Sequence, residues 1–533
     1  MREDKQGPMT LAINDSQMDL HVISFTGREA LNQPYRFDVD LVSRHSGLDC
    51  SNLLRRDAYL AFGPQQQGIH GQIWEANQLH AGDCLSLYRV SLMPDLQRLA
   101  TTSKARTFNG MSVPQIIKQL LGNHDIQTEA YRFERTTGLY PPREHCVQYQ
   151  ETDLHLLQRL CEEEGISFRF EHGLGGHVLV FADDPASFPE MMEALPMLLS
   201  RDGNESGIGI EHFAEQMSIH LSYSSHMYDN LPSVAAYQRS GVGGSALQTD
   251  ELSGVPSLFG VRDGESARQR QISTRTLERL RCERRVVKGR SNDPTLLSGQ
   301  IMRVTHHPER LLNDQWLLTE VRHEGMHLGV LKGCHSSDIA VIVKATLAMR
   351  ALTFRAMEPY QTSTTGSERM SACQYRNEFA VIPWAMPFRP ALDHRKPPIT
   401  GTHTATLSCP QAFDASGRVK LRFAWQPPSI DEGGQDSWAK LCNAVEINDS
   451  TAQVSVRFFD DDTDQPVICG VLCQATAESA VAALRRSLPT GVDENHLLLV
   501  PGQRLEVNDL QALTLRTSLA TLEMKPQGLT FSS

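Results

Sequence analysis

The first hundred residues alternate between apolar and polar positions with a period of two, which is typical of half-buried β-strands. Within residues 21–43, apolar side chains occupy every second position from Tyr35 to Leu41. The pattern returns in residues 58–63, 68–80 and 84–94, with Gly, Pro and Asp between the runs. Many short strands separated by turn residues indicate β-barrels or β-sandwiches.

Two segments instead show the spacing of apolar residues expected for helices. Residues 112–124 begin with Ser112 as the expected N-cap and carry Pro114 in the first turn. The second helix is expected to begin after Thr152 as N-cap and to end at Gly165.

The rest of the chain is assigned from the same signals. Residues 166–170 and 177–181 are expected to form a hairpin, and strands dominate from 207 to 342 around a helix at 264–286. Residues 357–398, rich in Pro, Ser, Thr and Gly, indicate a connector. A strand cluster at 400–475, a short helix at 478–488 and a strand-like tail follow. The sequence therefore predicts a mainly β chain with a few helices.

The tail gives a physical argument of its own, because its four short strands each carry an apolar row that no single strand could bury. Isolated hairpins of this size are marginal in water. Three copies around a three-fold axis would bury all the rows together and form a stiff β-prism. The alternative is that the tail forms a fourth small domain, which packs on the barrel of its own chain. The expected trimer core consists of Leu505, Val507, Leu513, Leu515, Ala520, Leu522, Met524, Leu529 and Phe531.

Composition narrows the class of protein. A chain of 533 residues predicts three or more domains. The N-terminus has no apolar signal-peptide core, and no run is long enough to cross a bilayer. Eleven cysteines without a CxxC pair favour reduced thiols, and a net charge of −12 argues against nucleic-acid binding. The basic cluster 279–285 is interpreted as a solvated helix face.

Residues 141–183 carry a dense motif: an Arg, then C-x-Q-Y-x-E-x-D, R-L, and E-E-G-I before alternating aromatics. This segment resembles the VgrG family, whose members look like fusions of a contractile-phage baseplate hub with its spike. Supporting matches lie at 25–39, 228–233, 306–325 and 375–390. The matching residues are Arg143, Cys146, Gln148, Tyr149, Glu151, Asp153, Arg159, Leu160, Glu163, Glu164, Gly165, Ile166, Phe168 and Phe170.

A second motif, GRVKLRFAWQ at 417–426 with 436–441 and 458–470, is similar to the small oligonucleotide-binding-type (OB-type) barrel of the family spike. The residues that carry this likeness are Gly417, Arg418, Val419, Phe423, Trp425 and Trp438. The chain departs from the family where a Gly-rich stretch is usual, since only 15 residues separate the W and F strands, and Asp460–Asp462 replace D-G-D. Shortened barrel loops are therefore expected.

The resemblance implies β-barrel hub domains at 1–375, a connector at 376–399, an OB-type spike base at 400–475, a helical linker at 476–490 and a short β-prism at 491–533. It also implies a homotrimer seated on a hexameric haemolysin-coregulated (Hcp-type) tube, with a PAAR-type tip protein and effectors. Such a chain would stay in the cytoplasm until assembly, then be secreted and contact a target membrane transiently. A hub-spike protein of a prophage or phage-tail-like particle would use the same residues.

One motif suggests catalysis instead. His323, Glu324 and His327 satisfy H-E-x-x-H, which binds zinc when it lies on a helix. Here it follows a strand pattern, and Gly325 interrupts it, so a zinc hydrolase is the less favoured alternative.

Two further groups of residues could bind metal. The acidic run from Asp460 to Asp464 lacks the spacing of a calcium loop and is interpreted as a solvated turn. His306 and His307 are interpreted as surface or core-edge residues. No phosphate-binding loop, dinucleotide fingerprint or nucleophile elbow occurs. The sequence therefore predicts no catalytic residue, no metal and no cofactor.

Overall fold

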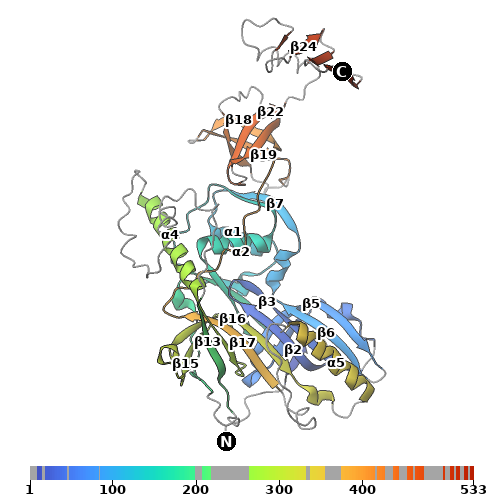
Figure 1. Cartoon of the computed structure of the whole chain (residues 1–533), viewed down its shortest axis with the longest axis vertical. Helices are drawn as coiled ribbons and strands as arrows, with labels where there is room; N and C mark the ends of the chain where they lie inside the picture. The colour runs from blue at the N-terminus through green and yellow to red at the C-terminus, as the bar shows by residue number, and fades with distance from the viewer. Residues whose placement is uncertain are drawn as a thin grey trace. The chain divides into compact units, whose positions relative to one another are not determined.

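The computed structural model describes most of the chain and divides it into two compact units (Figure 1). The first unit comprises Met1–Ser103, Met111–Pro142 and Glu151–Lys396, and the second comprises Lys104–Gly110, Arg143–Gln150 and Pro397–Ser533. The described residues are 9–14, 19–44, 47–82, 85–198, 207–217, 263–331, 336–353, 374–414, 417–426, 436–442, 453–459, 462–472, 496–497, 504–508, 512–516, 521–525 and 528–532.

The first unit is built mainly from strands. They are β1 Thr10–Ile13, β2 His21–Ala30, β3 Gln33–Ser43, β4 Asp57–Ala61, β5 Gly68–Ala81, β6 Ser86–Met93, β8 Tyr131–Phe133, β10 Ser167–Gly173, β11 Gly176–Ala182, β12 Leu195–Pro196, β13 Ile210–Met217, β14 Arg285–Ser291, β15 Ile301–Thr305, β16 Gln315–Met326 and β17 Gln374–Pro383. Its helices are α1 Val113–Gly122, α2 Asp153–Glu164, α4 Asp263–Arg284 and α5 Ser336–Thr353. Short 3-10 helices are η1 Cys50–Leu53, η2 Pro64–Gln66, η3 Asp95–Ala100, η4 Thr128–Ala130, η5 Pro185–Ser187, η6 Arg310–Leu312 and η7 Leu328–Leu331.

Most of these strands belong to one twelve-stranded sheet, with the order β1-β4-β5-β6-β3-β2-β16-β17-β14-β13 and with β15 beside β16 and β12 beside β15. Antiparallel pairing of β2 with β16 joins its early and late strands, and Figure 1 shows them on opposite sides of the unit. The alternation from Tyr35 to Leu41 buries Tyr35, Phe37, Val39 and Leu41, which confirms the strand prediction for this segment.

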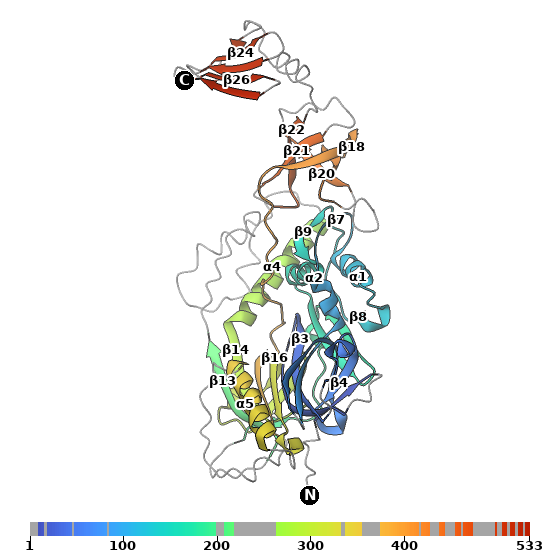
Figure 2. The same ribbon diagram turned by 90° about the vertical axis from the view of Figure 1, so that its right-hand side faces the viewer.

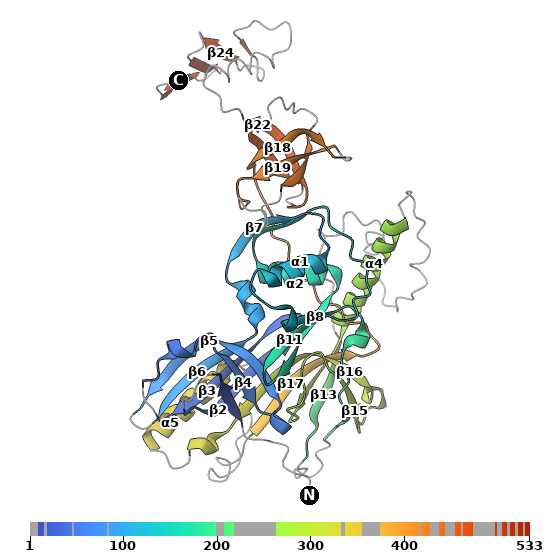
Figure 3. The ribbon, with the colours of Figure 1, turned by 180° about the vertical axis from the view of Figure 1, so that it is seen from behind.

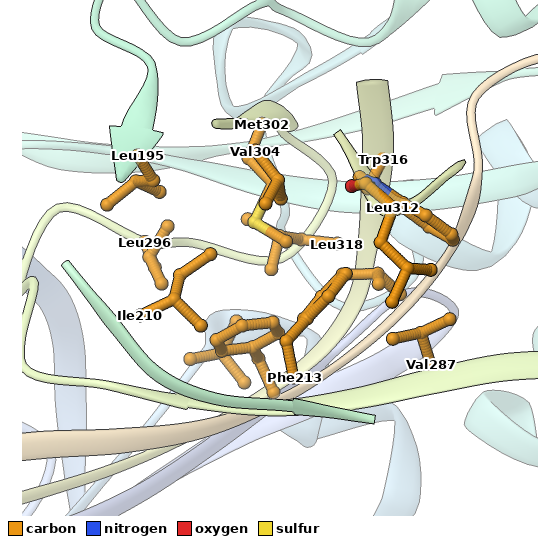
Figure 4. Close-up of a cluster of buried hydrophobic side chains, with 13 residues drawn as sticks. Leu195, Ile210, Phe213, Val287, Leu296, Met302, Val304, Leu312, Trp316 and Leu318 are labelled. Atoms are coloured by element: carbon orange, nitrogen blue, oxygen red, sulfur yellow. The ribbon is translucent and has the colours of Figure 1, made fainter. Parts of the chain in front are cut away.

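The late strands enclose an apolar core of their own (Figure 4). Trp316 and Leu318 on β16 lie over Phe213 on β13, and Trp316 and Phe213 meet edge to face at 5.4 Å between ring centroids. The Trp316 indole N–H donates to the Leu312 carbonyl at 3.1 Å, so its polar atom is satisfied within the core.

The two predicted helices near residues 113 and 153 are confirmed. α1 begins after Ser112, whose backbone N–H donates to Gln115 Oε1 at 2.8 Å in a capping box. α2 begins after Thr152, whose hydroxyl accepts from the His155 N–H at 3.1 Å, and Gly165 ends it in the left-handed conformation at φ 66°. The helix expected at 264–286 is α4, whereas α5 lies partly in a region predicted as strand and was missed.

The second unit contains a closed five-stranded barrel with the order β18-β19-β20-β22-β21. Its strands are β18 His403–Phe413, β19 Arg418–Phe423, β20 Ser437–Leu441, β21 Gln453–Phe458 and β22 Pro466–Leu472. Figure 3 shows the barrel from behind. Together with the strand-rich first unit, the barrel confirms the predicted fold class. Two further strands, β7 Ser103–Phe108 and β9 Cys146–Thr152, pair with each other and lie largely within this unit.

The tail forms a five-stranded antiparallel sheet with consecutive strands side by side, as Figure 2 shows. The strands are β23 His496–Leu497, β24 Arg504–Asn508, β25 Ala512–Arg516, β26 Thr521–Lys525 and β27 Gly528–Ser532.

The expected domain boundaries differ from the observed units in two ways. Residues 376–383, assigned to the connector, instead lie in β17, which pairs with β16 and β14 within the large sheet. Residues 104–110 and 143–150, assigned to the hub, belong to the second unit. The helix predicted at 478–488, the match at 228–233 and Ala520 lie outside the described residues.

Candidate functional site

The first motif is divided between the two units. Arg143, Gln148 and Tyr149 belong to the second unit, while the residues from Glu151 to Gly165 belong to the first. A continuous stretch of sequence therefore contributes to two separate packing environments.

In the first unit, the motif residues form a buried ion network on α2. Arg159, 2% exposed, donates from Nη2 to Glu151 Oε1 at 2.6 Å and from Nη1 to Glu163 Oε1 at 2.8 Å. His155 Nδ1 lies 2.7 Å from Glu151 Oε2. Because both carboxylates satisfy a guanidinium out of contact with water, loss of either partner of the Arg159–Glu151 pair would leave a buried charge. The network links Glu151, just before α2, to Arg159 in the middle of the helix.

Both ends of α2 are held by charged side chains from elsewhere in the unit. Asp153, fully buried, lies 2.7 Å from His124 Nε2 after α1. At the other end, Arg275 of α4 donates to the Glu164 carbonyl, and Arg279 donates to the Glu162 carbonyl. The interpretation of 279–285 as a solvated face is therefore wrong for Arg279, which is 6% exposed because α4 packs on the end of α2.

Asp183 is a buried carboxylate that no sequence motif marked. It accepts backbone N–H groups of Thr137 and Gly138, each at 2.7 Å, and it pairs with Arg275 Nη2 at 2.6 Å. Burial alone would raise the pKa of Asp183, but these donors and the Tyr140 hydroxyl lower it overall. Its position after β11 carried no recognised motif, and its donors come from distant segments.

In the second unit, the glycine and arginine of the barrel motif form a turn between β18 and β19. Gly417 adopts φ 71°, which favours glycine, and its N–H donates to the Asp414 carbonyl at 3.0 Å. Arg418 Nε donates to Asp414 Oδ2 at 2.6 Å, and its Nη1 lies 3.0 Å from Glu144 Oε2. Val419 follows as a fully buried core residue.

Aromatic side chains from both motifs meet at the barrel. Phe423 stacks on Trp425 with ring centroids 4.8 Å apart, and Tyr149 approaches Trp425 edge to face at 5.6 Å. Tyr149 also approaches His403 at 5.8 Å. The segment 143–150 therefore covers one side of this aromatic cluster. The rings of the cluster pack against one another within the second unit.

Polar contacts join residues 104–110, residues 143–150 and the barrel. The Val147 N–H donates to Asp464 Oδ1 at 3.0 Å, and the Asn109 side chain donates to the Asp436 carbonyl. Gln148, fully buried, accepts from Arg106 Nε at 2.7 Å. Trp438 is half-buried on β20.

The H-E-x-x-H motif lies on β16, as its strand pattern predicted. His323 is fully buried, with Nδ1 2.6 Å from the Tyr375 hydroxyl and Nε2 3.0 Å from Glu29 Oε1. A side chain on Gly325 would place its Cβ 2.2 Å from Phe25, so close packing requires this glycine. His327 lies beyond the strand end, and Glu324 pairs with Arg376.

Both ring nitrogens of His323 are thus engaged by protein groups. Across the described part of the chain, no group of three or more His, Cys, Asp or Glu is arranged to hold a metal ion.

A histidine cluster that the sequence did not reveal lies between β5, β10 and β11. His70 Nδ1 is 3.1 Å from His177 Nδ1, and the Asp95 N–H lies 3.3 Å from His177 Nε2. Because His177 Nε2 accepts from a backbone N–H, a neutral His177 carries its proton on Nδ1 and donates it to His70. His172 approaches Tyr35 edge to face at 4.9 Å beside this pair.

Burial is the largest cause of the low pKa values in this cluster. It lowers the pKa of His70, takes the pKa of His177 to about 4, and holds that of His172 well below its usual value. The positive charges of neighbouring histidines would add to the effect for His172 and His177. The cluster therefore favours neutral imidazoles.

The other possible metal ligands have structural contacts. Asp462 Oδ1 accepts from the Asp464 N–H at 3.0 Å, and Asp464 is half-buried against Val147, so the acidic turn is not wholly solvated. Asp460 and Asp461 lie outside the described residues. His306 is exposed, and His307 Nδ1 accepts from the Glu309 N–H at 3.0 Å.

In the tail, the strand register aligns the predicted apolar positions. Leu505, Leu515, Leu522 and Phe531 are consecutive cross-strand partners, and so are Val507, Leu513, Met524 and Leu529. Positions two apart on a strand share a face of the sheet. Both apolar rows therefore occupy positions of one face.

A strand-rich first unit and a second unit with a small closed barrel and a short terminal sheet define a hub-and-spike class of protein. Comparison with known proteins gives the same class. The profile of the family described as phage tail baseplate hub (GPD) matches residues 28–328. The chain belongs to this family, and the recognition of a VgrG-type chain is confirmed.

Curated relatives match most of the chain. The type VI secretion system spike proteins VgrG4b and VgrG5 of Pseudomonas aeruginosa are 34% and 35% identical to it, each over 88% of this chain. The aligned part is 56% and 57% of those proteins, so the chain spans just over half their length. The actin cross-linking toxin VgrG1 of Vibrio cholerae is 26% identical, with 86% of this chain and 40% of the toxin covered.

Among solved structures, the E. coli c3393 protein matches with a TM-score of 0.60 and 21% identity, covering 87% of this chain and all of that one. The c3393 protein is described as a component of the type VI secretion system with structural similarity to the T4 bacteriophage tail proteins gp27 and gp5. A chain of the Francisella PdpA–VgrG complex matches with a TM-score of 0.51 and 7% identity, covering 100% and 88%. These likenesses show the fold. Among the described residues, no helix is both long and apolar enough to cross a membrane.

Proposed function

We propose that this chain is the hub and spike of a type VI secretion apparatus. In this role it trimerises, sits on an Hcp-type hexameric tube and punctures a target envelope while carrying effectors. The spike proteins of Pseudomonas aeruginosa support the proposal by their similarity over most of the chain. The role is mechanical and requires no catalysis.

The observation that carries the proposal is the way the chain passes between its two units. It crosses from one to the other at residues 103/104, 110/111, 142/143, 150/151 and 396/397, which makes five covalent connections. The segments 104–110 and 143–150 are fixed to the barrel by contacts such as Tyr149 with Trp425 and Val147 with Asp464. A chain that must transmit thrust gains from such connections, because no single flexible linker carries the load.

The tail would complete the spike by assembly of three copies. Its two apolar rows lie in register on the positions of one face, and a three-fold arrangement would remove that face from water. The resemblance to the VgrG family implies that the hub parts of three chains would then match the six subunits of the tube. A PAAR-type protein and effectors would bind at the blunt end, which would contact the target membrane only transiently.

Such a protein would remain in the cytoplasm until assembly and would then be secreted by the apparatus. Removal of residues 490–533 tests the assembly step. We expect the truncated chain to be monomeric by light scattering while the first unit keeps its thermal transition. A truncated chain that trimerises as well as the full chain would contradict the proposed role of the tail.

A hub-spike protein of a prophage or phage-tail-like particle is a second candidate, because the matching family profile describes a phage tail hub. Secretion that requires a membrane-anchored complex would distinguish the type VI role from this one. Recovery of the chain in sheathed particles released by cell lysis would favour the prophage role.

The zinc hydrolase is disfavoured by the contacts of His323, whose two ring nitrogens meet Glu29 and Tyr375. Metal analysis of the purified chain and of the His323→Ala variant tests it. We expect both to lack stoichiometric zinc. One zinc ion per wild-type chain that is lost in the variant would instead support a zinc hydrolase.

A further inference from the structure

Two exposed cysteines lie on neighbouring strands of the barrel. Cys442 directly follows β20 and Cys469 lies within β22, and both are exposed free thiols. β20 and β22 run parallel, with Lys440 opposite Val467 and Leu441 opposite Ile468. Continuing this register by one residue places Cys442 opposite Cys469.

A backbone hydrogen bond independently supports this register. The Cys442 N–H donates to the Ile468 carbonyl at 3.0 Å. In a parallel ladder, a residue donates to the carbonyl that precedes its partner, so this bond makes Cys469 the partner of Cys442. Neighbouring strands lie about 4.8 Å apart, within the Cα separation that a disulfide bridges, and directly opposed residues occupy the same face.

The two cysteines lie at the shortest pairing of the barrel. Among the described residues, β20 and β22 share two Cα partner pairs, whereas the other four strand pairings have between four and six. The closure of the barrel therefore depends on few hydrogen bonds at this pairing. A covalent bond there would close the barrel independently of the ladder.

The four other free cysteines of the described residues have different surroundings, and Cys146 is buried. Burial raises the pKa of Cys282 to about 11 and that of Cys161 well above its usual value, and burial also raises the pKa of half-buried Cys50. Thiolate is the reactive form, so these thiols are poor nucleophiles at neutral pH. Exposure leaves Cys442 and Cys469 accessible to an oxidant.

We propose that Cys442 and Cys469 form a reversible disulfide that covalently closes the barrel between β20 and β22. The oxidant is a disulfide of a small thiol or of a redox protein. One cysteine thiolate attacks that disulfide, giving a mixed disulfide and releasing one thiol. The second cysteine then displaces the other thiol. In sum, the two thiols are oxidised to one disulfide, and one external disulfide is reduced to two thiols.

The bond would be absent in a reducing compartment and would form in an oxidising one. It would constrain a loop that runs from Cys442 through β21 to Cys469, and cross-linking such a loop stabilises a fold mainly by restricting its unfolded chain. The proposal concerns the barrel alone and does not depend on the secretion role.

The test uses the purified full chain incubated with oxidised glutathione or with dithiothreitol, followed by alkylation and trypsin digestion. Cleavage after Lys440 and Arg457 puts Cys442 in peptide 441–457 and Cys469 in peptide 458–485. We expect a disulfide-linked pair of these peptides in the oxidised sample, with its loss in both Cys442→Ser and Cys469→Ser. The barrel transition of the oxidised wild type should rise by roughly 5 °C or more over the reduced one.

Cys473→Ser and Cys50→Ser are the matched controls. Cys473 shares peptide 458–485 with Cys469, so linkage that survives Cys473→Ser assigns the bond to Cys469. Cys50→Ser removes a thiol of the first unit and should change neither linkage nor melting. Free alkylation of Cys442 and Cys469 after oxidation, stable mixed disulfides with glutathione, linkage between chains, or a bond to Cys473 would each overturn the proposal.

Discussion

The large sheet and the tail sheet share the same alternation of apolar and polar residues, but they differ in what covers their apolar positions. In the first unit, Phe25, Phe37 and Trp316 are buried by strands and loops of the same chain. In the tail, the register gathers Leu505, Leu515 and their partners on positions of one face of a single five-stranded sheet. Alternation therefore predicts strands in both regions. It does not by itself predict that the tail needs other chains, because this need arises from the apolar surface that a single small sheet cannot bury.

The largest effect is expected from charges in the apolar rows of the tail. Leu515→Asp combined with Leu522→Asp places two carboxylates at directly paired positions. Burial of unpaired charge is costly, so we expect the trimer to dissociate to monomers at micromolar concentration. Light scattering measures the mass. Thr514→Lys with Thr530→Lys, on positions of the opposite face, is the matched control and should remain trimeric.

Next in size is the buried ion network of the first unit. Arg159→Ala leaves Glu151 buried without its guanidinium, and we expect a loss of about 3–5 kcal/mol in the free energy of unfolding. Chemical denaturation followed by circular dichroism measures it. The control is Arg132→Ala, which breaks an exposed pair with Glu171 and should cost less than about 1 kcal/mol. Equal losses in the two variants would show that burial of the network contributes nothing.

A smaller effect is expected where the motif segment covers the barrel. Tyr149→Ala removes the ring that approaches Trp425 and His403, and we expect the barrel to lose about 1–3 kcal/mol. Tryptophan fluorescence should shift to longer wavelength as Trp425 gains water. The nearby Gln150→Ala, at an exposed position, serves as control. An unchanged spectrum in Tyr149→Ala would mean that this segment does not shield the barrel.

The smallest effect is the pH response of the histidine cluster. The folded pKa of His177 is about 4, below the ordinary value near 6.5, so the folded state binds fewer protons than the unfolded state in acid. Stability is therefore complete above about pH 6.5 and falls as the pH drops toward 4. We expect a loss of about 1–2 kcal/mol between pH 7 and pH 5.

His177→Gln should reduce this pH dependence, because position 177 then carries no imidazole, while His70 and His172 keep theirs. The groups facing His177 are His70, His172, Asp95 and Arg98. Thermal melts at pH 7, 6 and 5 measure the slope. An identical slope in the variant would show that protonation of His177 does not cause the loss of stability in acid.

Much of the fold could be predicted from the sequence because alternation and capping act locally. Ser112, Thr152 and Gly165 fixed helix ends by short-range hydrogen bonds and backbone geometry. α5 was missed because its apolar residues are spread along a run that strands also permit. Residues 376–383 were misassigned because composition favoured a connector, while pairing with β16 and β14 determines their conformation.

The candidate site was predictable in its residues but not in its partners. Glu151 and Arg159 were recognised from a motif, yet Asp183, Arg279 and the cluster of His70 with His177 depend on segments far apart in the chain. No local pattern marks a side chain whose burial comes from a helix more than a hundred residues away. The solvated interpretation of Arg279 failed for this reason.

The proposed spike role depends most on the assembly of identical chains through the tail. The most direct test is the mass of the full chain in solution, measured by light scattering coupled to size-exclusion chromatography over a range of concentrations. We expect a species of three times 59.5 kDa. A species of 59.5 kDa that persists at high concentration, with tail amides protected from hydrogen exchange, would contradict it.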